Sequence, residues 1–348
     1  MSTKDQLLEL FESNKGVFFS GEEIAGNIGC SRAAVWKAIQ TLRSAGYPIE
    51  AVPGKGYLLS ETSDILSSQG IRKYLGALSD ELDITVLPVV DSTNNYLRER
   101  AAEDPRALPD GFTVLADCQT QGRGRVGRSF FSPPNTGIYM SIFLRPDHCS
   151  AEQAMRFTTL ASVAAVRAIR EASGQEAKIK WVNDIYLNRR KVAGILTEAS
   201  FSMESGLLDY AVLGIGFNAY TPAEGFPEEL RSSVGSIFAN QVHDGKNRLA
   251  SSFLKHFMAL YREGAADPSS YLDEYRACSL VLGEKITVFR RGLPAGVPLH
   301  ASEKSAEESG GRPALALNID DRGSLIVRYD DGSEETLNTG EISIRLRA

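Results

Sequence analysis

The 348-residue chain lacks long apolar runs, paired cysteines and an excess of basic residues, and each absence excludes a class of protein. The first residues, MSTKDQLLELFESNKG, do not have the basic, apolar and small-residue segments of a secretory signal, and no apolar run is long enough to span a bilayer. We therefore expect a cytoplasmic location without a membrane partner. The four cysteines and four histidines are scattered without paired or metal-ligand spacing, which predicts neither a disulfide framework nor a metal site.

Net positive charge and the common nucleotide-binding motifs are missing too. The formal net charge is -6, so any contact with DNA must come from a local basic patch. No segment ends in the Gly-Lys-Ser/Thr of a Walker A loop, and no Gly-x-Gly-x-x-Gly opens a helix after a strand. What remains is the composition of an ordinary globular protein, whose length predicts two or three domains.

Residues 1–62 predict a winged helix-turn-helix domain, because three helical patterns are followed by two short strands. Ser20 and Glu23 form a capping box for the second helix, and Ser31 can cap a third. The two strands turn at Pro53 and Gly54, as a wing would. The residues that we expect to contact DNA lie on the third helix and at the tip of the wing: Ser31, Arg32, Trp36, Lys37, Gln40, Arg43 and Lys55.

The charge of this domain leaves its role open. Residues 1–62 contain six basic and seven acidic side chains, a weak balance for a DNA-binding domain. Most of the acidic residues precede the third helix, so a polarised DNA-binding surface remains compatible with the sequence. The alternative is a winged helix that is kept only as a packing module.

Residues 63–279 predict a mixed sheet covered by helices, since strand patterns alternate with long helical ones. Strands are predicted at 84–90, 112–116, 138–144, 178–182, 192–198 and 210–217, and an alanine-rich helix is predicted to start at a Ser150/Gln153 capping box. The polar stretch 60–68 is interpreted as a linker. Residues 280–348 predict a small all-β domain with Asp-Arg-Gly and Asp-Asp-Gly turns, in which the polar segment 301–313 forms a loop.

Glycine and arginine alternate in the stretch QTQGRGRVGRSFFSPPNTG, residues 119–137. Glycines let backbone amides approach an anion, and Arg123, Arg125 and Arg128 supply planar donors that match phosphate and carboxylate. We interpret this segment, the Arg-Gly loop, as a nucleotide-binding loop. The alternative is a solvated turn on the surface.

A second stretch, KIKWVNDIYLNRRKVAGILTEAS, predicts a hairpin with Lys180 on its first strand. Such a lysine most often faces solvent. If Lys180 instead faces the Arg-Gly loop, its ammonium group is able to neutralise an α-phosphate. Asn183 and Asp184 are interpreted as residues that shape the turn.

Two shorter motifs suggest ligand contacts. VVDSTNNYL places Ser92 and Thr93 at a helix N-terminus, where hydroxyls and free backbone amides bind small polar ligands; plain capping is the alternative. GIGFN, residues 214–218, ends a strand with two glycines that allow close approach of a ligand, and Asn218 has the amide needed to read a base edge. A β-bulge is the alternative for the glycine pair.

Taken in order, these motifs resemble those of biotin protein ligases over nearly the whole chain. They are DSTN, QTQGRGRVGR with FFSP, KWVND with KVAGIL, GIGFN and a final GEISIR. With SRAAVWKAIQTLRSAG and VPGKGYLL, the chain is similar to the bifunctional subclass in which the ligase is also the biotin operon repressor. The resemblance implies an α+β multidomain fold: a winged helix-turn-helix domain, a central mixed β-sheet of the biotin/lipoate ligase type, and a small C-terminal SH3-like β-barrel.

The resemblance also implies the reaction and the partners. Biotin and ATP with Mg²⁺ give biotinyl-5'-AMP, and biotin is then transferred to a lysine of a biotin carboxyl carrier protein. The DNA partner is the operator of biotin-synthesis genes, bound by a ligand-promoted homodimer. A lipoate ligase or octanoyl transferase, and a transcription factor whose C-terminal part only senses a ligand, are the alternatives.

The site residues implied by the resemblance fall into three groups. Lys180 and Arg125 are implied to be catalytic, and no residue is implied to bind a metal. The biotin-binding residues are Ser92, Thr93, Asn94, Gln119, Gly122, Arg123, Gly124 and Lys180; the residues that bind ATP or the adenylate are Arg123, Arg125, Arg128, Phe130, Lys180, Asn183 and Asn218. The chain departs from the family at Val182, where proline is usual, and at Phe130, where tryptophan is common; neither change removes a reacting group.

Overall fold

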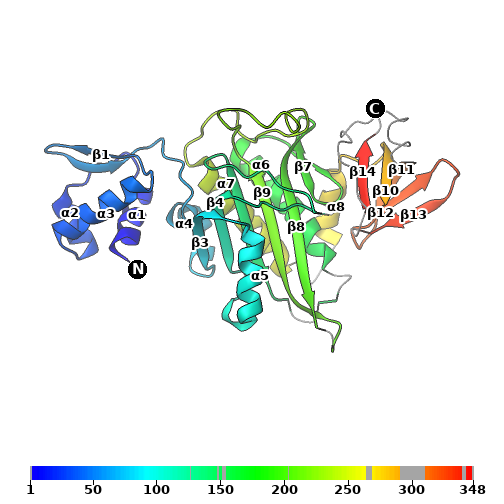
Figure 1. Cartoon of the computed structure of the whole chain (residues 1–348), viewed down its shortest axis with the longest axis horizontal. Coiled ribbons are helices and arrows are strands. Elements are labelled where there is room, and N and C mark those ends of the chain that lie inside the picture. Colours follow the sequence, from blue (N-terminus) through cyan, green and yellow to red (C-terminus); the bar gives the residue numbers. More distant parts are fainter. Residues whose placement is uncertain are drawn as a thin grey trace.

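The structure is a computed structural model, and it describes residues 2–125, 127–146, 149–150, 154–202, 204–263, 269–290, 310–338 and 342–346. Figure 1 shows three parts arranged along the longest axis, with the N-terminus in the first and the C-terminus in the last. Most of the predicted loop 301–313 lies outside the described residues. Among the described residues, no helix is both long and apolar enough to cross a membrane.

The first part confirms the predicted winged helix-turn-helix. It consists of α1 (Thr3–Ser13), α2 (Gly21–Ile28), α3 (Arg32–Ser44), β1 (Ile49–Val52) and β2 (Gly56–Leu59), and the two strands pair antiparallel as the wing. The Ser20 and Glu23 side chains form the capping box of α2, and the Ser31 hydroxyl accepts from the Ala34 amide at the start of α3. The helices bury a core of their own, separate from that of the rest of the chain, with Leu7, Phe11, Ile24, Val35 and Ile39 among its members.

The second part is built on a seven-stranded mixed sheet in the order β3-β4-β5-β9-β8-β7-β6. Its strands are β3 (Ile84–Val90), β4 (Thr113–Gln119), β5 (Gly137–Leu144), β6 (Lys178–Lys180), β7 (Asp184–Leu187), β8 (Arg190–Phe201) and β9 (Leu208–Asn218). Its helices are α4 (Ser68–Leu75), α5 (Thr93–Glu103), α6 (Met155–Ser173), α7 (Gly245–Glu263) and α8 (Ser269–Ala277), with short 3-10 turns η1 (Gly76–Ser79) and η2 (Pro105–Ala107).

Alternating side chains of the central strands divide the helices between the two faces of the sheet. Ile138, Met140 and Ile142 of β5 share the large core with residues of α6 and α7. Phe143, on the opposite side of the same strand, packs with Leu97 of α5 in a smaller cluster. Since successive side chains of a strand point to opposite faces, α5 covers the face opposite to that covered by α6 and α7.

Three predictions for this part were wrong in detail. Helix α6 begins at Met155 without a side-chain cap, so Ser150 does not start it, and Gln153 lies outside the described residues. The predicted strand 178–182 ends at Lys180, and β7 follows after a short turn. Residues 60–68 are not a free linker, because Ser63, Asp64, Leu66 and Ser67 are buried.

The third part is a five-stranded antiparallel sheet in the order β13-β12-β11-β10-β14, which confirms the predicted small β domain. The strands are β10 (Lys285–Arg290), β11 (Arg312–Ile319), β12 (Leu325–Tyr329), β13 (Glu334–Leu337) and β14 (Ile342–Leu346). Its apolar residues belong to the same core as those of the central sheet. The domain boundaries after residues 62 and 279 remain predictions.

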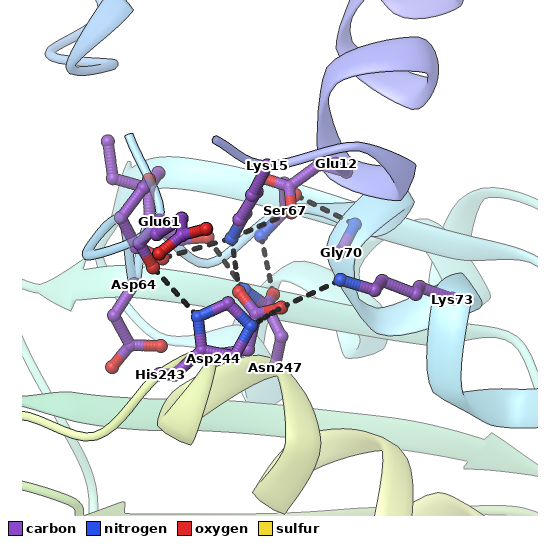
Figure 2. Close-up of polar contacts among 12 residues, drawn as sticks. Glu12, Lys15, Glu61, Asp64, Ser67, Gly70, Lys73, His243, Asp244 and Asn247 are labelled. Atoms are coloured by element: carbon purple, nitrogen blue, oxygen red, sulfur yellow. Dashed lines mark hydrogen bonds and ion pairs between the residues drawn. The ribbon is translucent and has the colours of Figure 1, made fainter. Parts of the chain in front are cut away.

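A buried charged cluster joins the winged helix to the central part (Figure 2). Lys15, just after α1, forms ion pairs with Glu12 at 2.9 Å and with Asp244, which directly precedes α7. Asp244 also accepts from Lys73 Nζ at 3.1 Å and from the Tyr74 hydroxyl at 2.6 Å, both on α4. Three segments that are distant in sequence therefore meet at one carboxylate, which is fully buried.

The two buried carboxyl groups of this cluster have opposite pKa shifts. Burial would raise the pKa of Asp244, but the hydrogen bonds from Lys15 and Tyr74 outweigh it and lower that pKa. Burial dominates at Glu12 and raises its pKa in spite of the neighbouring Lys15. The contribution of Asp244 to folding stability is therefore lost as pH falls through its lowered pKa, where the carboxylate becomes protonated. The contribution of Glu12 is lost as pH rises through its raised pKa, where the buried carboxyl group must ionise.

We predict that Asp244→Asn loosens the winged helix from the central part. The substitution leaves Lys15 buried without its main counter-charge, and removal of one partner from a buried pair costs about 3–5 kcal/mol. Limited proteolysis should cut faster within residues 60–67. Lys73→Met is the matched control, because it removes an ion pair to the same carboxylate while leaving Lys15 paired, and the more exposed Lys73 is expected to contribute less than Lys15. Equal cleavage rates for Asp244→Asn and the parent protein would contradict the role assigned to the cluster.

Candidate active site

One cavity collects most of the residues that the sequence singled out. It is formed by the start of α5, the end of β4, the Arg-Gly loop and the surface of strands β5 to β9. Of the predicted site residues, the following line it: Ser92, Thr93, Asn94, Gln119, Arg123, Gly124, Arg125, Arg128, Phe130, Lys180 and Asn183. The predicted hairpin lysine therefore faces the Arg-Gly loop and not bulk solvent.

The floor of the cavity is a sheet surface without side chains at three positions. Gly194 of β8 pairs with Gly216 of β9, and Gly214 lies two residues before Gly216. A Cβ atom at Gly214 would overlap the Asn94 amide, and one at Gly216 would lie 2.5 Å from the Phe130 ring. Because these positions have no Cβ atom, Asn94 and Phe130, which both line the cavity, can lie directly against the sheet. The ladder has no register shift at these positions, so the alternative of a bulge is wrong.

The hydroxyl and amide groups at the start of α5 are already oriented by the protein. The Thr93 amide donates to Gln119 Oε1 at 2.8 Å, and Gln119 Nε2 donates to the Ser132 hydroxyl at 3.1 Å. The Ser141 hydroxyl lies 2.7 Å from Thr93 Oγ1. Ser92 precedes the helix but does not cap it with its side chain. These groups form a polar end of the cavity at a helix N-terminus, which suits a small polar head group.

Asn94 is a structural member of this end. Its Oδ1 accepts from Ser141 at 2.6 Å, and its Nδ2 donates to Glu198 at 2.9 Å and to the Leu196 carbonyl at 3.3 Å. The side chain is buried, and it packs over Gly214. Although Asn94 lines the cavity, its amide is engaged by the protein, so its part in biotin binding stays a prediction.

The Arg-Gly loop folds back on itself as a short antiparallel turn. The Phe130 amide donates to the Gly122 carbonyl at 2.8 Å, and the Gly124 amide donates to the Arg128 carbonyl at 2.7 Å. A Cβ at Gly122 would overlap the Phe130 carbonyl oxygen, so Gly122 serves the close approach of the two arms. Gly122 does not itself line the cavity.

The three arginines of the loop have different surroundings. Arg123 Nη1 donates to Asn95 Oδ1 at 2.8 Å and pairs with Glu198 at 3.2 Å, so its guanidinium binds protein groups. Arg125 donates to Asn183 Oδ1 at 3.2 Å, and burial lowers the pKa of its guanidinium. Arg128 is exposed at the mouth of the cavity. Arg125 and Arg128 are therefore the loop cations placed for an anionic ligand.

The turn that carries Lys180 is held from behind by the C-terminal part of the chain. Trp181 Nε1 donates to the Gly323 carbonyl at 3.0 Å, and the Tyr275 hydroxyl of α8 donates to the Val182 carbonyl at 3.0 Å. Lys180 itself is buried, although it borders the cavity. The small β domain thus fixes the position of a predicted catalytic lysine.

Sequence reasoning missed a second lysine at this cavity. Lys191, at the start of β8, folds over Gly194, and its ammonium group lies 2.6 Å from Asp184 Oδ1. Both residues line the cavity, so Asp184 does more than shape a turn. The motif KVAGIL already contained this residue: Lys191 lies at the start of a strand, directly after the turn that follows β7.

Asn218 lies apart from the cavity-lining residues. It is buried at the end of β9, and its amide reaches the Lys191 carbonyl at 3.5 Å. Phe130, which does line the cavity, rests over Gly216 and packs edge-on against Tyr139 with 6.3 Å between ring centroids. The adenine contacts of Phe130 and Asn218 both stay predictions; of the two residues, Phe130 lines the cavity.

Comparison with known proteins assigns the family. Residues 86–218 match the biotin/lipoate A/B protein ligase family, residues 3–58 match an HTH domain, and residues 308–345 match the biotin protein ligase C-terminal domain. The chain is 39% identical over 329 residues to the bifunctional ligase/repressor BirA of Bacillus subtilis (strain 168), covering 94% of this chain and 95% of that protein. The chain belongs to this family of bifunctional biotin protein ligases and repressors.

Other members of the family agree with the assignment. The ligase/repressor BirA of Escherichia coli (strain K12) is 33% identical over 341 residues, with 95% of this chain and 94% of that protein covered. A solved biotin protein ligase from Aquifex aeolicus, in complex with biotin and ATP, superimposes with a TM-score of 0.60 at 23% identity, covering 76% of this chain and 99% of that chain. That structure confirms the ligase fold of the central and C-terminal parts.

We predict that Gly214→Ala weakens ligand binding by this ligase. The added methyl group displaces Asn94, which is buried and bonded on both sides of its amide, and overpacking of this kind costs about 1–3 kcal/mol. Titration with biotin should show a loss of affinity of about tenfold. Gly26→Ala, where nothing lies within 4 Å of the new Cβ, is the control. Unchanged affinity in Gly214→Ala would show that Asn94 is free to move.

Proposed function

We propose that this ligase activates biotin with ATP in the cavity described above and then transfers it to a carrier protein. One observation carries the proposal: the polar end formed by Ser92, Thr93 and Gln119 and the cationic end formed by arginines and lysines belong to a single cavity. The polar end suits the ureido head of biotin, whose carboxylate then points toward the cations. Biotin-dependent formation of an adenylate tests this proposal directly.

The first half of the reaction needs alignment and charge neutralisation but no protein nucleophile. The biotin carboxylate oxygen attacks the α-phosphorus of ATP, the bond to the bridging oxygen breaks, and pyrophosphate leaves. Arg125, Lys180 and Lys191 line the cavity, which supports a role for them in stabilising the negative charge that develops on the phosphoryl oxygens. Their partial burial strengthens this stabilisation, because the local dielectric is lower than that of water.

The donor set of the cavity fits a Mg²⁺ ion that enters with ATP. Among the described residues that line the cavity, Asp184 is the carboxylate, and Mg²⁺ in nucleotide sites is commonly held by one or two carboxylates together with phosphate oxygens. When bound, the ion would neutralise charge on the phosphates. Asp184 would hold the ion, and Lys191, which is paired with Asp184, lies next to the same position.

In the second half, the amino group of a lysine on a biotin carboxyl carrier protein attacks the carbonyl carbon of the mixed anhydride, and AMP leaves. The adenylate must be kept from water until that lysine arrives. The Arg-Gly loop borders the cavity and presents Arg125 and Arg128 to the phosphate, so its closure would retain the intermediate. We further propose a cytoplasmic location, where ATP and DNA are both available.

The winged helix is proposed to bind the operator of biotin-synthesis genes as a ligand-promoted dimer. Arg32, Trp36 and Lys37 are exposed on α3, and Arg32, Trp36 and the wing residue Lys55 line one groove. Gln40 is half-buried. Lys15 is buried in the interdomain cluster and therefore does not add to the basic surface. With so few available cations, one copy neutralises few phosphates, and two copies are needed for a stable complex.

Arg43, predicted to contact DNA, has a structural partner instead. Its guanidinium donates to the Ile49 carbonyl at 3.0 Å through Nε and at 2.8 Å through Nη2, which ties the end of α3 to the wing. We therefore assign the DNA contacts of α3 to its earlier turns.

Exchange of labelled pyrophosphate into ATP should depend on biotin and should not occur with lipoate or octanoate. Lys180→Ala and Lys191→Ala should each lower the exchange rate roughly 10²–10³-fold, the usual effect of removing one group that stabilises transition-state charge. Lys178→Ala, an exposed position on the same strand as Lys180, is the control. Equal exchange with lipoate would refute the substrate assignment. A wild-type exchange rate in both Lys180→Ala and Lys191→Ala would show that neither lysine stabilises the transition state.

Operator binding should require biotin with ATP, and Arg32→Ala should weaken it while reducing the slope of log affinity against log salt by about one. Arg43→Ala should act differently, by lowering the stability of the winged helix because it frees the wing. Footprinting on a biotin-synthesis promoter, alongside thermal unfolding, distinguishes the two effects. Protection that is independent of ligand, or unaffected by Arg32→Ala, would contradict the proposed coupling.

A further inference from the structure

One carboxylate outside the cavity connects three elements that shape it. Glu198 of β8 accepts from Asn94 Nδ2 at 2.9 Å and forms ion pairs at 3.2 Å with Arg98 of α5 and Arg123 of the Arg-Gly loop. Its side chain is about one-fifth exposed, and it is absent from the cavity-lining residues. No sequence motif pointed to it.

We infer that Glu198 is a positioning residue, which sets the arrangement of the Arg-Gly loop relative to the start of α5 and so determines the affinity for biotin. The inference rests on the proposed function. Two guanidinium groups and one amide share this carboxylate, so its removal leaves two nearby positive charges without their common counter-charge. The Arg123 side chain would then be held to α5 by its hydrogen bond to Asn95.

The geometry connects this contact to the ligand. Asn94, held by Glu198, packs over Gly214 and accepts from Ser141, which also contacts Thr93. Arg123 lies in the arm of the loop next to α5, whereas Arg125 is held separately, by its hydrogen bond to Asn183 of the hairpin. Loss of Glu198 therefore loosens the biotin end of the site at two points, while the buried Lys180 and its turn, which are held by the C-terminal part, stay in place. The expected signature is a change in KM for biotin with little change in kcat.

Glu198→Gln tests the inference, because it keeps the size of the side chain and removes its charge. In pyrophosphate exchange, KM for biotin should rise about tenfold, as expected when charge-assisted hydrogen bonds are lost, while kcat stays within about twofold. Release of biotinyl-adenylate into solution should rise in parallel. Glu198→Asp should restore part of the affinity. Arg98→Gln is the matched control: it removes an ion pair to the same carboxylate but leaves Arg123 and Asn94 bound, so KM should stay near that of the parent.

A double-mutant cycle with Arg123→Gln tells positioning from general destabilisation. If Arg123 acts through Glu198, the double variant should be no worse than either single variant. A fall in kcat with unchanged KM, additive effects of the two substitutions, or an equal rise of KM in Arg98→Gln would each overturn the inference. Absence of biotin-dependent exchange in the parent protein would instead refute the proposed function, so the two failures are distinguishable.

Discussion

The active site depends on the absence of side chains at neighbouring positions of β8 and β9. Gly194, Gly214 and Gly216 let Asn94 and Phe130 lie directly on the sheet, closer than any Cβ atom would allow. Asn94 brings the start of α5 down onto one part of this surface, and Phe130 brings the end of the Arg-Gly loop down onto another. The cavity is the space left between these two elements, so its width is set by close contact between backbone and side chains.

This construction explains why the polar groups at the biotin end are bonded to one another. Thr93, Gln119 and Ser141 form a connected set in which each side chain is oriented by another. A ligand that binds such a set meets groups whose rotamers are already fixed, and less conformational entropy is lost on binding. The cationic end differs. Arg128 is exposed, and Arg125 contacts the hairpin through Asn183, so the cations of this end are less enclosed by the protein than the polar groups.

Local patterns in the sequence predicted the elements that local chemistry determines. The capping box at Ser20, the cap at Ser31 and the strand 84–90 all follow from spacing over a few residues, and the structure has them. The Arg-Gly loop and Lys180 were also placed at one site, because the ordered motifs resemble a family whose fold unites them.

What could not be predicted depends on contacts between distant segments. Nothing around Glu198 distinguishes it from a solvent-facing strand residue until α5 and the loop are placed beside it. Residues 60–68 have the composition of a linker, but Ser63, Asp64, Leu66 and Ser67 are buried, and Asp64 accepts from the Lys246 amide at the start of α7. Arg43 is a related case, since the helical spacing does not reveal that its guanidinium binds the Ile49 carbonyl, which lies beyond the helix.

The interdomain cluster and the biotin end meet on β4, and this limits how ligand binding affects DNA binding. Lys246, two residues after Asp244, pairs with Asp117 at 3.1 Å, and Asp117 lies on the same strand as Gln119. A chain of contacts transmits a signal only if it has two arrangements whose balance the ligand changes. Most of these side chains are buried in tightly packed surroundings, which favours a single arrangement. Under the proposed function, the ligand therefore controls DNA binding through the Arg-Gly loop, by a higher affinity for the proposed dimer than for the monomer.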